Sequence, residues 1–169
     1  MIRITSLLFI TIALTASVLS QTSLKPGTPA PSFSGTTLDG KAYNLDDLRG
    51  SVVVVTFWST KCLICHGELP KLSRTTASYD SKKVVFLALS MENDAKVGAY
   101  LQKNPLNFQT MPNSLGTLLK YADRDKAGNL DMGFPSFFVI DQEGVIRHRA
   151  SGYGKTSGLE SAIGKLGAK

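Results

Sequence analysis

The sequence predicts an α/β domain whose partly parallel sheet is covered by helices on both faces. Residues 52–55 are four consecutive valines, and a β-branched run this continuous is typical of a strand buried on both sides. Apolar runs typical of strands alternate with helical segments along most of the chain. The length of 169 residues suits one domain with a substantial core.

The region before the valine-rich strand is predicted to form a hairpin and a short helical turn. Residues 22–31 are rich in Pro, Thr and Gly, which indicates an extended lead-in. The segment 33–45 carries Asp39-Gly40 between short runs of strand-forming residues, a typical hairpin signal. Residues 46–50, which end in glycine, fit one helical turn.

Strands and helices then alternate to the end of the chain. The predicted strands are 51–58, 84–90, 137–140 and 145–149, and the predicted helices are 62–79, 94–103, 114–121 and 156–166. The last two strands are joined by residues 141–144, which form a second hairpin signal. The order is therefore hairpin, β-α-β-α, a short extra segment and β-β-α.

The first twenty residues are predicted to be a secretory signal peptide. Arg3 is their only charged side chain, an apolar run at 7–19 follows, and Ser20-Gln21 fits a cleavage point. The run is shorter than the roughly 20 apolar residues of a spanning helix, although an uncleaved membrane anchor remains an alternative. We therefore expect a signal peptide or anchor at 1–20, one folded domain at 21–169, and a periplasmic or secreted location.

The overall charge and composition exclude several classes of protein. Hydrophobic residues make up 43% and charged residues 19%, a globular composition. The net charge of +6 comes from scattered basic residues, and 147–149 is the nearest approach to a basic cluster. A nucleic-acid binder needs a basic stripe, so we expect no nucleic-acid partner. A basic surface instead favours acidic protein partners or an anionic membrane.

Cys62 and Cys65, the two cysteines of the chain, follow the predicted buried strand at CxxC spacing. Cys62 is expected at the start of the next helix, where unpaired N–H groups and the helix dipole stabilise an anion. In such sites the pKa of a thiol falls from ~8.5 toward ~7. Cys62 is therefore the candidate nucleophile, and the adjacent Lys61 would strengthen the effect. Cys65, one turn later, would be more buried and would resolve a mixed disulfide.

A structural bridge and a metal site are the simpler explanations of this cysteine pair. A bridge closing so small a loop would stabilise the fold by only about 2 kcal/mol on the chain-entropy estimate. Zinc prefers four ligands, and the chain adds only His66 and His148 to the two cysteines. The strand–CxxC–helix context favours redox chemistry instead, and we expect neither a metal nor an organic cofactor.

Three segments carry a resemblance to a known family. Residues 57–70 (FWSTKCLICHGELP) resemble the active-site segment of the thioredoxin superfamily, above all its TlpA/ResA group of extracytoplasmic thiol–disulfide oxidoreductases. Residues 133–141 (GFPSFFVID) and 27–33 (GTPAPSF) extend the resemblance over nearly all of the chain. It implies a thioredoxin-like three-layer α/β/α sandwich with an N-terminal β-hairpin and an inserted helical segment at about 91–131.

The resemblance also implies roles for individual residues. Cys62 corresponds to the attacking thiol, Cys65 to the resolving thiol, and Pro135 to a cis-proline that faces the disulfide. Phe134 would present its backbone to a bound partner chain. Glu68 corresponds to a glutamate buried beneath the cysteines, where burial would raise its pKa and let it exchange a proton with Cys65. The alternative is a surface acid favoured by the first turns of a helix.

Trp58 and Lys61 complete the expected surroundings of the cysteines. Trp58 would form the wall and core near the site, and Lys61 would lie on the surface that a partner meets. The dipeptide Leu63-Ile64 lacks the proline common at its second position in this family. Because this dipeptide helps to set the reduction potential, the direction of electron flow stays open.

The expected activity is protein disulfide oxidoreduction through Cys62 and Cys65, with exported client proteins and an upstream redox partner. The family implies clients such as apocytochromes or copper-centre proteins. A peroxiredoxin-like peroxidase is one alternative, but its Pro-x-x-x-Thr-x-x-Cys pattern meets Val55 and Ser59 here. A Cu(I) chaperone is another, because thiolates suit this soft ion, although related chaperones space their cysteines by three residues.

Overall fold

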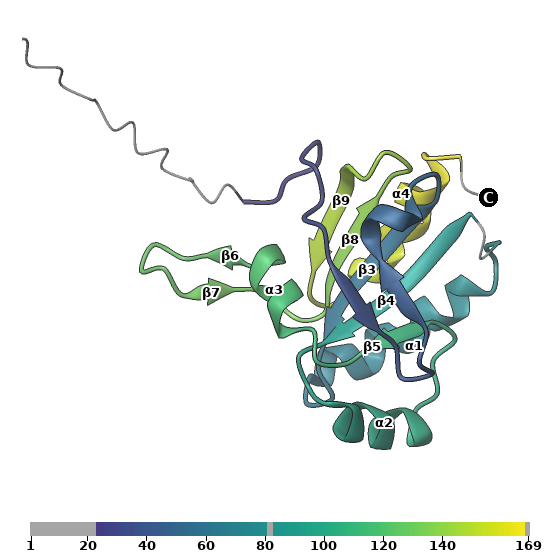
Figure 1. The fold of residues 1–169 in the computed structure, drawn as a ribbon, viewed down its shortest axis with the longest axis vertical. Coiled ribbons are helices and arrows are strands. Elements are labelled where there is room, and N and C mark those ends of the chain that lie inside the picture. Colours follow the sequence, from purple (N-terminus) through teal and green to yellow (C-terminus); the bar gives the residue numbers. More distant parts are fainter. Residues whose placement is uncertain (1–22, 81–82, 168–169) are drawn as a thin grey trace, which may run out of the picture.

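The computed structural model describes residues 23–80 and 83–167, and a five-stranded mixed sheet forms their centre (Figure 1). The strand order is β5-β4-β3-β8-β9. These strands are β3 (Val52–Trp58), β4 (Val84–Ser90), β5 (Gln109–Met111), β8 (Ser136–Ile140) and β9 (Ile146–Ser151). Strands β3, β4 and β5 are parallel, whereas β8 and β9 run antiparallel to their neighbours. The expected signal peptide at 1–20 lies outside the described residues.

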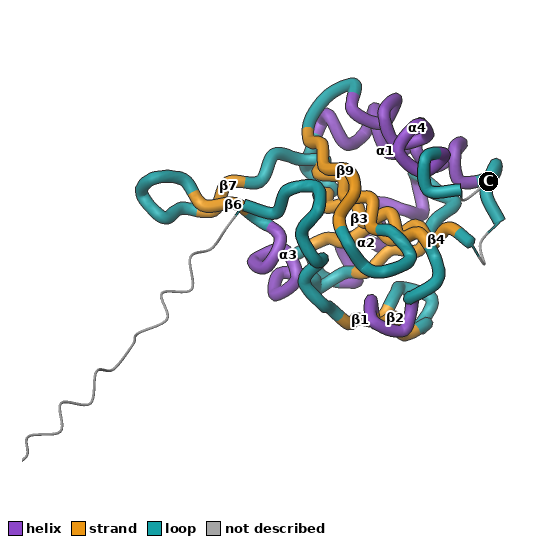
Figure 2. Tube along the Cα trace, turned by 90° about the horizontal axis from the view of Figure 1, so that it is seen from above, coloured by secondary structure: helices purple, strands orange, loops and turns teal. Residues whose placement is uncertain are grey.

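Helices cover both faces of this sheet, as predicted. They are α1 (Leu63–Thr76), α2 (Asp94–Lys103), α3 (Leu115–Tyr121) and α4 (Leu159–Gly164), with short 3-10 turns η1 (Leu45–Leu48) and η2 (Lys155–Gly158). Figure 2 shows α1 and α4 on one side of the sheet and α3 with the N-terminal hairpin on the other. The fold is therefore a three-layer α/β/α sandwich.

Strand β3 shows why the valine run predicts the centre of the sheet. All seven of its residues are buried. Val52 and Val54 pack in one cluster with Leu72 of α1 and Leu159 of α4. Val53, Val55 and Phe57 point the other way, into a second cluster with α3 and the N-terminal segment. Successive side chains of a strand alternate between faces, so both faces of β3 contribute to a core.

The N-terminal hairpin also agrees with the prediction. Strands β1 (Ser34–Thr36) and β2 (Ala42–Asn44) pair antiparallel. Gly40 lies in the turn between them with φ of +82°, a conformation that glycine adopts without steric cost. The short helical turn that follows is η1, and it begins after Asn44, whose side chain accepts from the backbone N–H of Asp46.

The inserted segment contains more structure than the sequence indicated. Besides α2 and α3 it holds β5, which extends the central sheet, and a small hairpin of β6 (Asp123–Arg124) and β7 (Leu130–Asp131). Figures 1 and 2 both show this hairpin projecting from the body of the domain beside α3. Within residues 23–80 and 83–167, no helix is long and apolar enough to cross a membrane.

Tyr121 joins α3 to the lead-in segment. Its side chain is fully buried and contacts the rings of Phe33 and Phe138 edge-on, with centroids 6.1 Å and 5.0 Å away. Its hydroxyl donates a 2.9 Å hydrogen bond to the carbonyl oxygen of Pro31. This contact fixes the lead-in over one face of the sheet.

We expect Tyr121→Phe to lower the free energy of unfolding by about 1 kcal/mol, because the buried hydrogen bond is lost while the ring packing is kept. Urea denaturation monitored by circular dichroism measures this. Tyr153→Phe is the matched control, since the Tyr153 side chain is 76% exposed and the same atom is removed. Equal effects of the two substitutions would contradict the assignment.

Candidate active site

The cysteine pair lies where β3 passes into α1. Cys62 is the N-cap residue of α1, with an extended backbone, and the helix begins at Leu63. The Sγ of Cys62 accepts a 3.1 Å hydrogen bond from the backbone N–H of Cys65. The two cysteines are joined by a disulfide, and their Cα atoms are 5.2 Å apart. The predicted placement of Cys62 at the start of a helix is confirmed.

The two sulfurs differ in their access to solvent. Cys65 is fully buried, whereas Cys62 is partly exposed. Lys61, Leu63 and Ile64, which flank Cys62 in the chain, are exposed, and Leu63 and Ile64 are among the exposed large apolar side chains. A partner can therefore reach Cys62 before it reaches Cys65, in agreement with the expected division of labour.

An apolar cluster supports the disulfide from below. Trp58 at the end of β3, Leu69 of α1 and Val97 of α2 are fully buried around Cys65. Because the Trp58 side chain is completely enclosed, any contribution it makes to partner binding is indirect. Phe134 is partly buried and packs against the same cluster.

Pro135 reaches the site from the opposite strand. The Phe134–Pro135 peptide bond is cis, as the resemblance implied. Phe57 pairs with Ser136 across β3 and β8, so Pro135, the residue before Ser136, lies at the end of β8 that is next to the carboxyl end of β3. The carbonyl oxygen of Pro135 accepts a 2.9 Å hydrogen bond from the backbone N–H of Gly152. The carboxyl end of β3, the CxxC turn and Pro135 thus meet at one edge of the sheet.

Glu68 lies fully buried on α1 within a hydrogen-bond network. Its Oε1 accepts from the Nζ of Lys71 at 2.7 Å. Its Oε2 accepts from the hydroxyl of Thr156 at 2.7 Å and from the backbone N–H of Thr156 at 3.3 Å. Lys71 also lies over the ring of Tyr153, 5.3 Å from its centroid. Glu68 therefore ties the active-site helix to η2.

The expected raised pKa of Glu68 is wrong. Burial does raise the pKa of this carboxyl, but hydrogen bonds from Lys71 and Thr156 outweigh it and lower the pKa from its ordinary 4.5 to about 2. Glu68 is therefore ionised at neutral pH in the disulfide form. Neither Lys71 nor Thr156 was identified from the sequence, and Thr156 is 88 residues away along the chain.

Glu92 is a second carboxylate at the site, and it was also missed. It follows β4, and its Oε2 and Oε1 accept from the backbone N–H and the hydroxyl of Thr60, both at 2.7 Å. The position of Glu92 in the sequence could have indicated this role. The carboxyl ends of the parallel strands β3 and β4 lie at the same end of the sheet, so an acidic residue just after β4 lies beside the turn after β3.

His66 is exposed on the helix surface, as predicted, but it has specific contacts. Its Nε2 lies 2.9 Å from the carbonyl oxygen of Thr60. Its ring stacks on Tyr100 of α2, with centroids 5.1 Å apart. Within the described part of the chain, no three His, Cys, Asp or Glu side chains are grouped as a metal ion would require.

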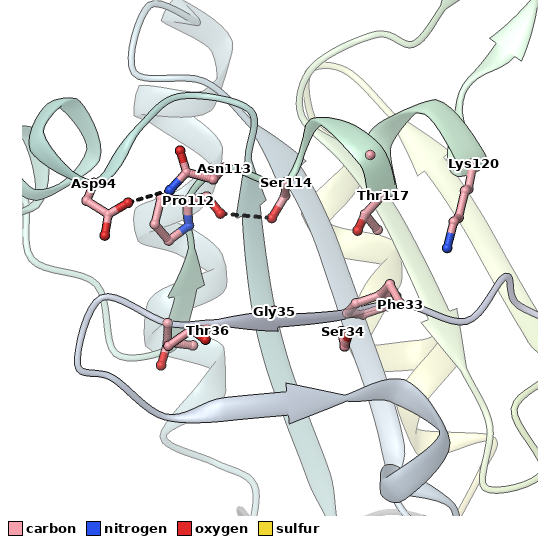
Figure 3. Close-up of a pocket in the computed structure, with 12 residues that line it drawn as sticks. Phe33, Ser34, Gly35, Thr36, Asp94, Pro112, Asn113, Ser114, Thr117 and Lys120 are labelled. Atoms are coloured by element: carbon pink, nitrogen blue, oxygen red, sulfur yellow. Dashed lines mark hydrogen bonds between the residues drawn. The ribbon is translucent and has the colours of Figure 1, made fainter.

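A cavity of about 520 Å³ lies beside the loop that carries Glu92, because the backbone N–H of Asn113, one of its lining residues, donates to the carbonyl oxygen of Glu92. Strand β1 and the loop before α3 line it, and Figure 3 shows Asp94 bonded to Asn113 at one end and Lys120 at the other. None of the residues expected to form the redox site lines this cavity.

Comparison with known proteins identifies the family. Residues 25–163 match the family model described as Redoxin. The chain belongs to the Redoxin family. The thiol-disulfide oxidoreductase ResA of Bacillus anthracis is 30% identical over 141 residues, which cover 83% of this chain and 78% of ResA. The thioredoxin-like protein YneN of Bacillus subtilis is 27% identical over 130 residues, 75% of this chain and 72% of YneN.

Solved structures agree with these relatives. A thiol:disulfide interchange protein of the thioredoxin family from Chlorobium tepidum superimposes with a TM-score of 0.70 at 25% identity, covering 86% of this chain and 99% of that one. The chain is therefore a thiol–disulfide oxidoreductase of thioredoxin-like fold, similar to ResA. Neither the peroxidase nor the Cu(I) chaperone alternative is favoured by these matches.

We expect the low pKa of Glu68 to appear as a pH dependence of stability. A carboxyl whose pKa is depressed by folding stabilises the protein above its unfolded pKa, here about 4.5, and this stabilisation is lost as the pH falls toward about 2. The wild type should lose roughly 2 kcal/mol more than Glu68→Gln over this range. The full shift would give more, but the Lys71 side chain is 45% exposed and solvent screens the ion pair.

Denaturant unfolding between pH 2 and pH 6 measures this difference. Lys71→Met should give an intermediate slope, because it removes the strongest of the hydrogen bonds that lower the pKa of Glu68. Parallel pH curves for the wild type and Glu68→Gln would show that Glu68 is not held ionised by these contacts.

Proposed function

We propose that the protein exchanges electrons with exported client proteins, with Cys62 as the attacking thiol and Cys65 as the resolving thiol. One observation carries this proposal: the partly exposed Cys62 caps α1, while Cys65 is fully buried one turn later. In the disulfide form the Sγ of Cys62 accepts a hydrogen bond from the backbone N–H of Cys65. In the reduced protein this N–H group and the helix dipole favour a thiolate at the same sulfur.

The reductive direction is a two-step exchange. The Cys62 thiolate attacks one sulfur of a client disulfide, and the other client sulfur leaves as a thiolate that takes up a proton. The Cys65 thiol loses its proton and attacks Cys62 Sγ, which releases the second client thiolate. The client gains two electrons, and the Cys62–Cys65 disulfide forms. An upstream dithiol reduces this disulfide again, and the relative potentials decide which direction prevails.

The rim of the site supports a protein substrate. Lys61, Leu63 and Ile64 flank Cys62 in the chain and are exposed, with the Leu63 side chain 83% exposed. In our proposal the backbone of Phe134, beside the cis bond to Pro135, aligns an extended client segment against the disulfide. An exposed lysine beside two exposed apolar side chains favours clients with apolar segments and acidic flanks.

In this scheme Glu68 exchanges a proton with Cys65 only after its contact with Lys71 is broken. With a pKa of about 2 it is too weak a base to deprotonate Cys65 while Lys71 and Thr156 remain bound. Proton exchange with Cys65 therefore requires Lys71 to leave the carboxylate first, which raises the pKa of Glu68. The half-exposed position of Lys71 permits this movement.

Export is proposed from the pattern of residues 1–20. The single basic residue, the apolar run and the small residues before Gln21 follow the layout of a signal peptide. Two structures of the same fold come from proteins whose descriptions place them outside the cytoplasm: an exposed lipoprotein thioredoxin of Streptococcus pneumoniae and a secreted disulfide oxidoreductase of Mycobacterium tuberculosis.

Replacing Cys65 with serine should trap clients as mixed disulfides on Cys62, because the resolving thiol is gone. Non-reducing electrophoresis followed by mass spectrometry identifies them, and the bands should collapse with dithiothreitol. In the same preparation the wild type should reduce insulin, whereas Cys65→Ser should lose at least 100-fold in turnover (about 2.7 kcal/mol).

Cys62→Ser is the matched control, since it retains a single cysteine that is buried. It should trap nothing and should leave insulin oxidised. Equal trapping by the two variants, or insulin reduction that survives either substitution, would contradict the assigned order of attack.

We expect the full chain, expressed in a bacterium with a C-terminal tag, to leave the cytoplasm and to begin at Gln21. Cell fractionation and N-terminal sequencing measure this. A membrane-bound chain of full length would favour the anchor instead, and a full-length chain in the cytosol would overturn the proposed export.

A further inference from the structure

We propose that Glu92 is a positioning residue for the redox pair, whose carboxylate orients the turn leading into Cys62 and whose charge makes the pair a stronger reductant. This inference rests on the proposed function of Cys62 and deepens it. The residues between the two cysteines do not by themselves determine the reduction potential, and in this proposal the loop after β4 helps to set it.

The carboxylate of Glu92 holds the turn at two atoms. It accepts both the backbone N–H and the hydroxyl of Thr60 at 2.7 Å, and Thr60 precedes Cys62 by two residues. The turn is closed by the Cys62 backbone N–H, which donates to the carbonyl oxygen of Ser59 at 3.1 Å. Fixing the Thr60 peptide therefore fixes the direction from which the chain reaches the N-cap of α1.

Glu92 is itself held rigidly. Its backbone N–H donates to the hydroxyl of Ser90 at 3.2 Å, and its carbonyl oxygen accepts from the backbone N–H of Asn113 at 2.8 Å. The backbone of Glu92 is thus anchored to the end of β4 and to the loop before α3, and its carboxylate also accepts a 3.3 Å hydrogen bond from the hydroxyl of Ser90. Because the Glu92 side chain is already held in place, it can orient the turn without a further loss of conformational entropy.

The same carboxylate is a negative charge close to the reactive sulfur. Burial raises the pKa of Glu92, but hydrogen bonds from Thr60, Ser59 and Ser90 outweigh it, so the pKa lies below its usual range. Thr60 and Cys62 are two residues apart, at most about 7 Å along the chain. The charge therefore lies on the order of 10 Å from Sγ, about one Debye length at 0.1 M salt.

Other titratable groups lie on the elements around Cys62. Lys61 precedes it in the turn, and His66 and Glu68 lie on α1, while Tyr100 of α2 stacks on His66. Lys61 and the helix dipole favour a thiolate, whereas Glu92 opposes it. A thiolate that is less stabilised leaves the reduced form less stable relative to the disulfide, and the pair becomes more reducing.

Glu92→Gln separates the two roles, because an amide can keep both contacts with Thr60 while the charge is lost. We expect the pKa of the Cys62 thiol in reduced Glu92→Gln to fall by about half a unit. The equilibrium constant with glutathione should shift about threefold toward the dithiol, equivalent to about 14 mV. Alkylation rates across pH and redox titration in glutathione buffers measure both quantities.

Glu92→Ala removes the contacts as well as the charge. It should show the same direction of shift in potential, and a loss of about tenfold in the rate of insulin reduction, because the turn is no longer held. Asp94→Asn is the matched control: it removes one negative charge nearby, but Asp94 bonds to Asn113 and not to the active-site turn. Its thiol pKa and potential should match the wild type.

A Glu92→Gln protein whose Cys62 pKa and glutathione equilibrium equal those of the wild type would overturn the electrostatic role, and a Glu92→Ala protein with an unchanged insulin rate would overturn the positioning role. These outcomes are distinct from failure of the proposed function, in which the wild type itself would reduce no insulin. The glutathione titration needs no client, so it remains informative in that case.

Discussion

The N-terminus of α1, capped by a sulfur, is the constraint on which the rest of the site depends. An N-cap position is usually filled by an oxygen of Ser, Thr, Asp or Asn that accepts a backbone N–H near the start of the helix. Here the Sγ of Cys62 accepts from Cys65 instead. The donor that would stabilise a thiolate is therefore already in position in the disulfide form, and reduction requires no new arrangement of the backbone to create it.

Two carboxylates lie around this helix start, and each is held by hydrogen bonds to other residues. Glu68 is neutralised from below by Lys71 and Thr156, whereas Glu92 is bound from the side by Thr60. In our proposal the acidity of Cys62 is the difference between the favourable field of the helix and the opposing charge of Glu92. Such a difference can be changed by substitutions that leave the cysteines and the fold untouched.

What could be predicted from the sequence was encoded locally. Four consecutive valines indicate β3, Asp39-Gly40 indicates the hairpin, and the CxxC after a buried strand indicates the helix start. Strand β5 has only three residues of mixed polarity, and it forms because β4 offers it a parallel edge. The formation of β5 depends on its pairing with β4 more than on the sequence of its own three residues.

The pKa values in the site could not be predicted from the sequence, because they also depend on contacts between residues that are far apart in the chain. The family resemblance implied that Glu68 is buried beneath the cysteines, but its ionisation depends on Lys71 and on Thr156, which the fold brings back from 88 residues away. Glu92 is brought to Thr60 across 32 residues by the pairing of β3 with β4. A pKa reflects the sum of such contacts, and single-residue patterns do not contain them.

The inserted segment is connected to the site at both of its ends. It opens with Glu92 on the active-site turn, and it closes with the β6–β7 hairpin, which leads within a few residues into Phe134. Arg149 of β9 clamps the base of that hairpin through Asp123, with nitrogen–oxygen distances of 3.0 Å and 2.6 Å. One end of the insertion contacts the turn before Cys62 and the other leads into the segment before Pro135, so we expect substitutions at either end to act on the surroundings of the disulfide.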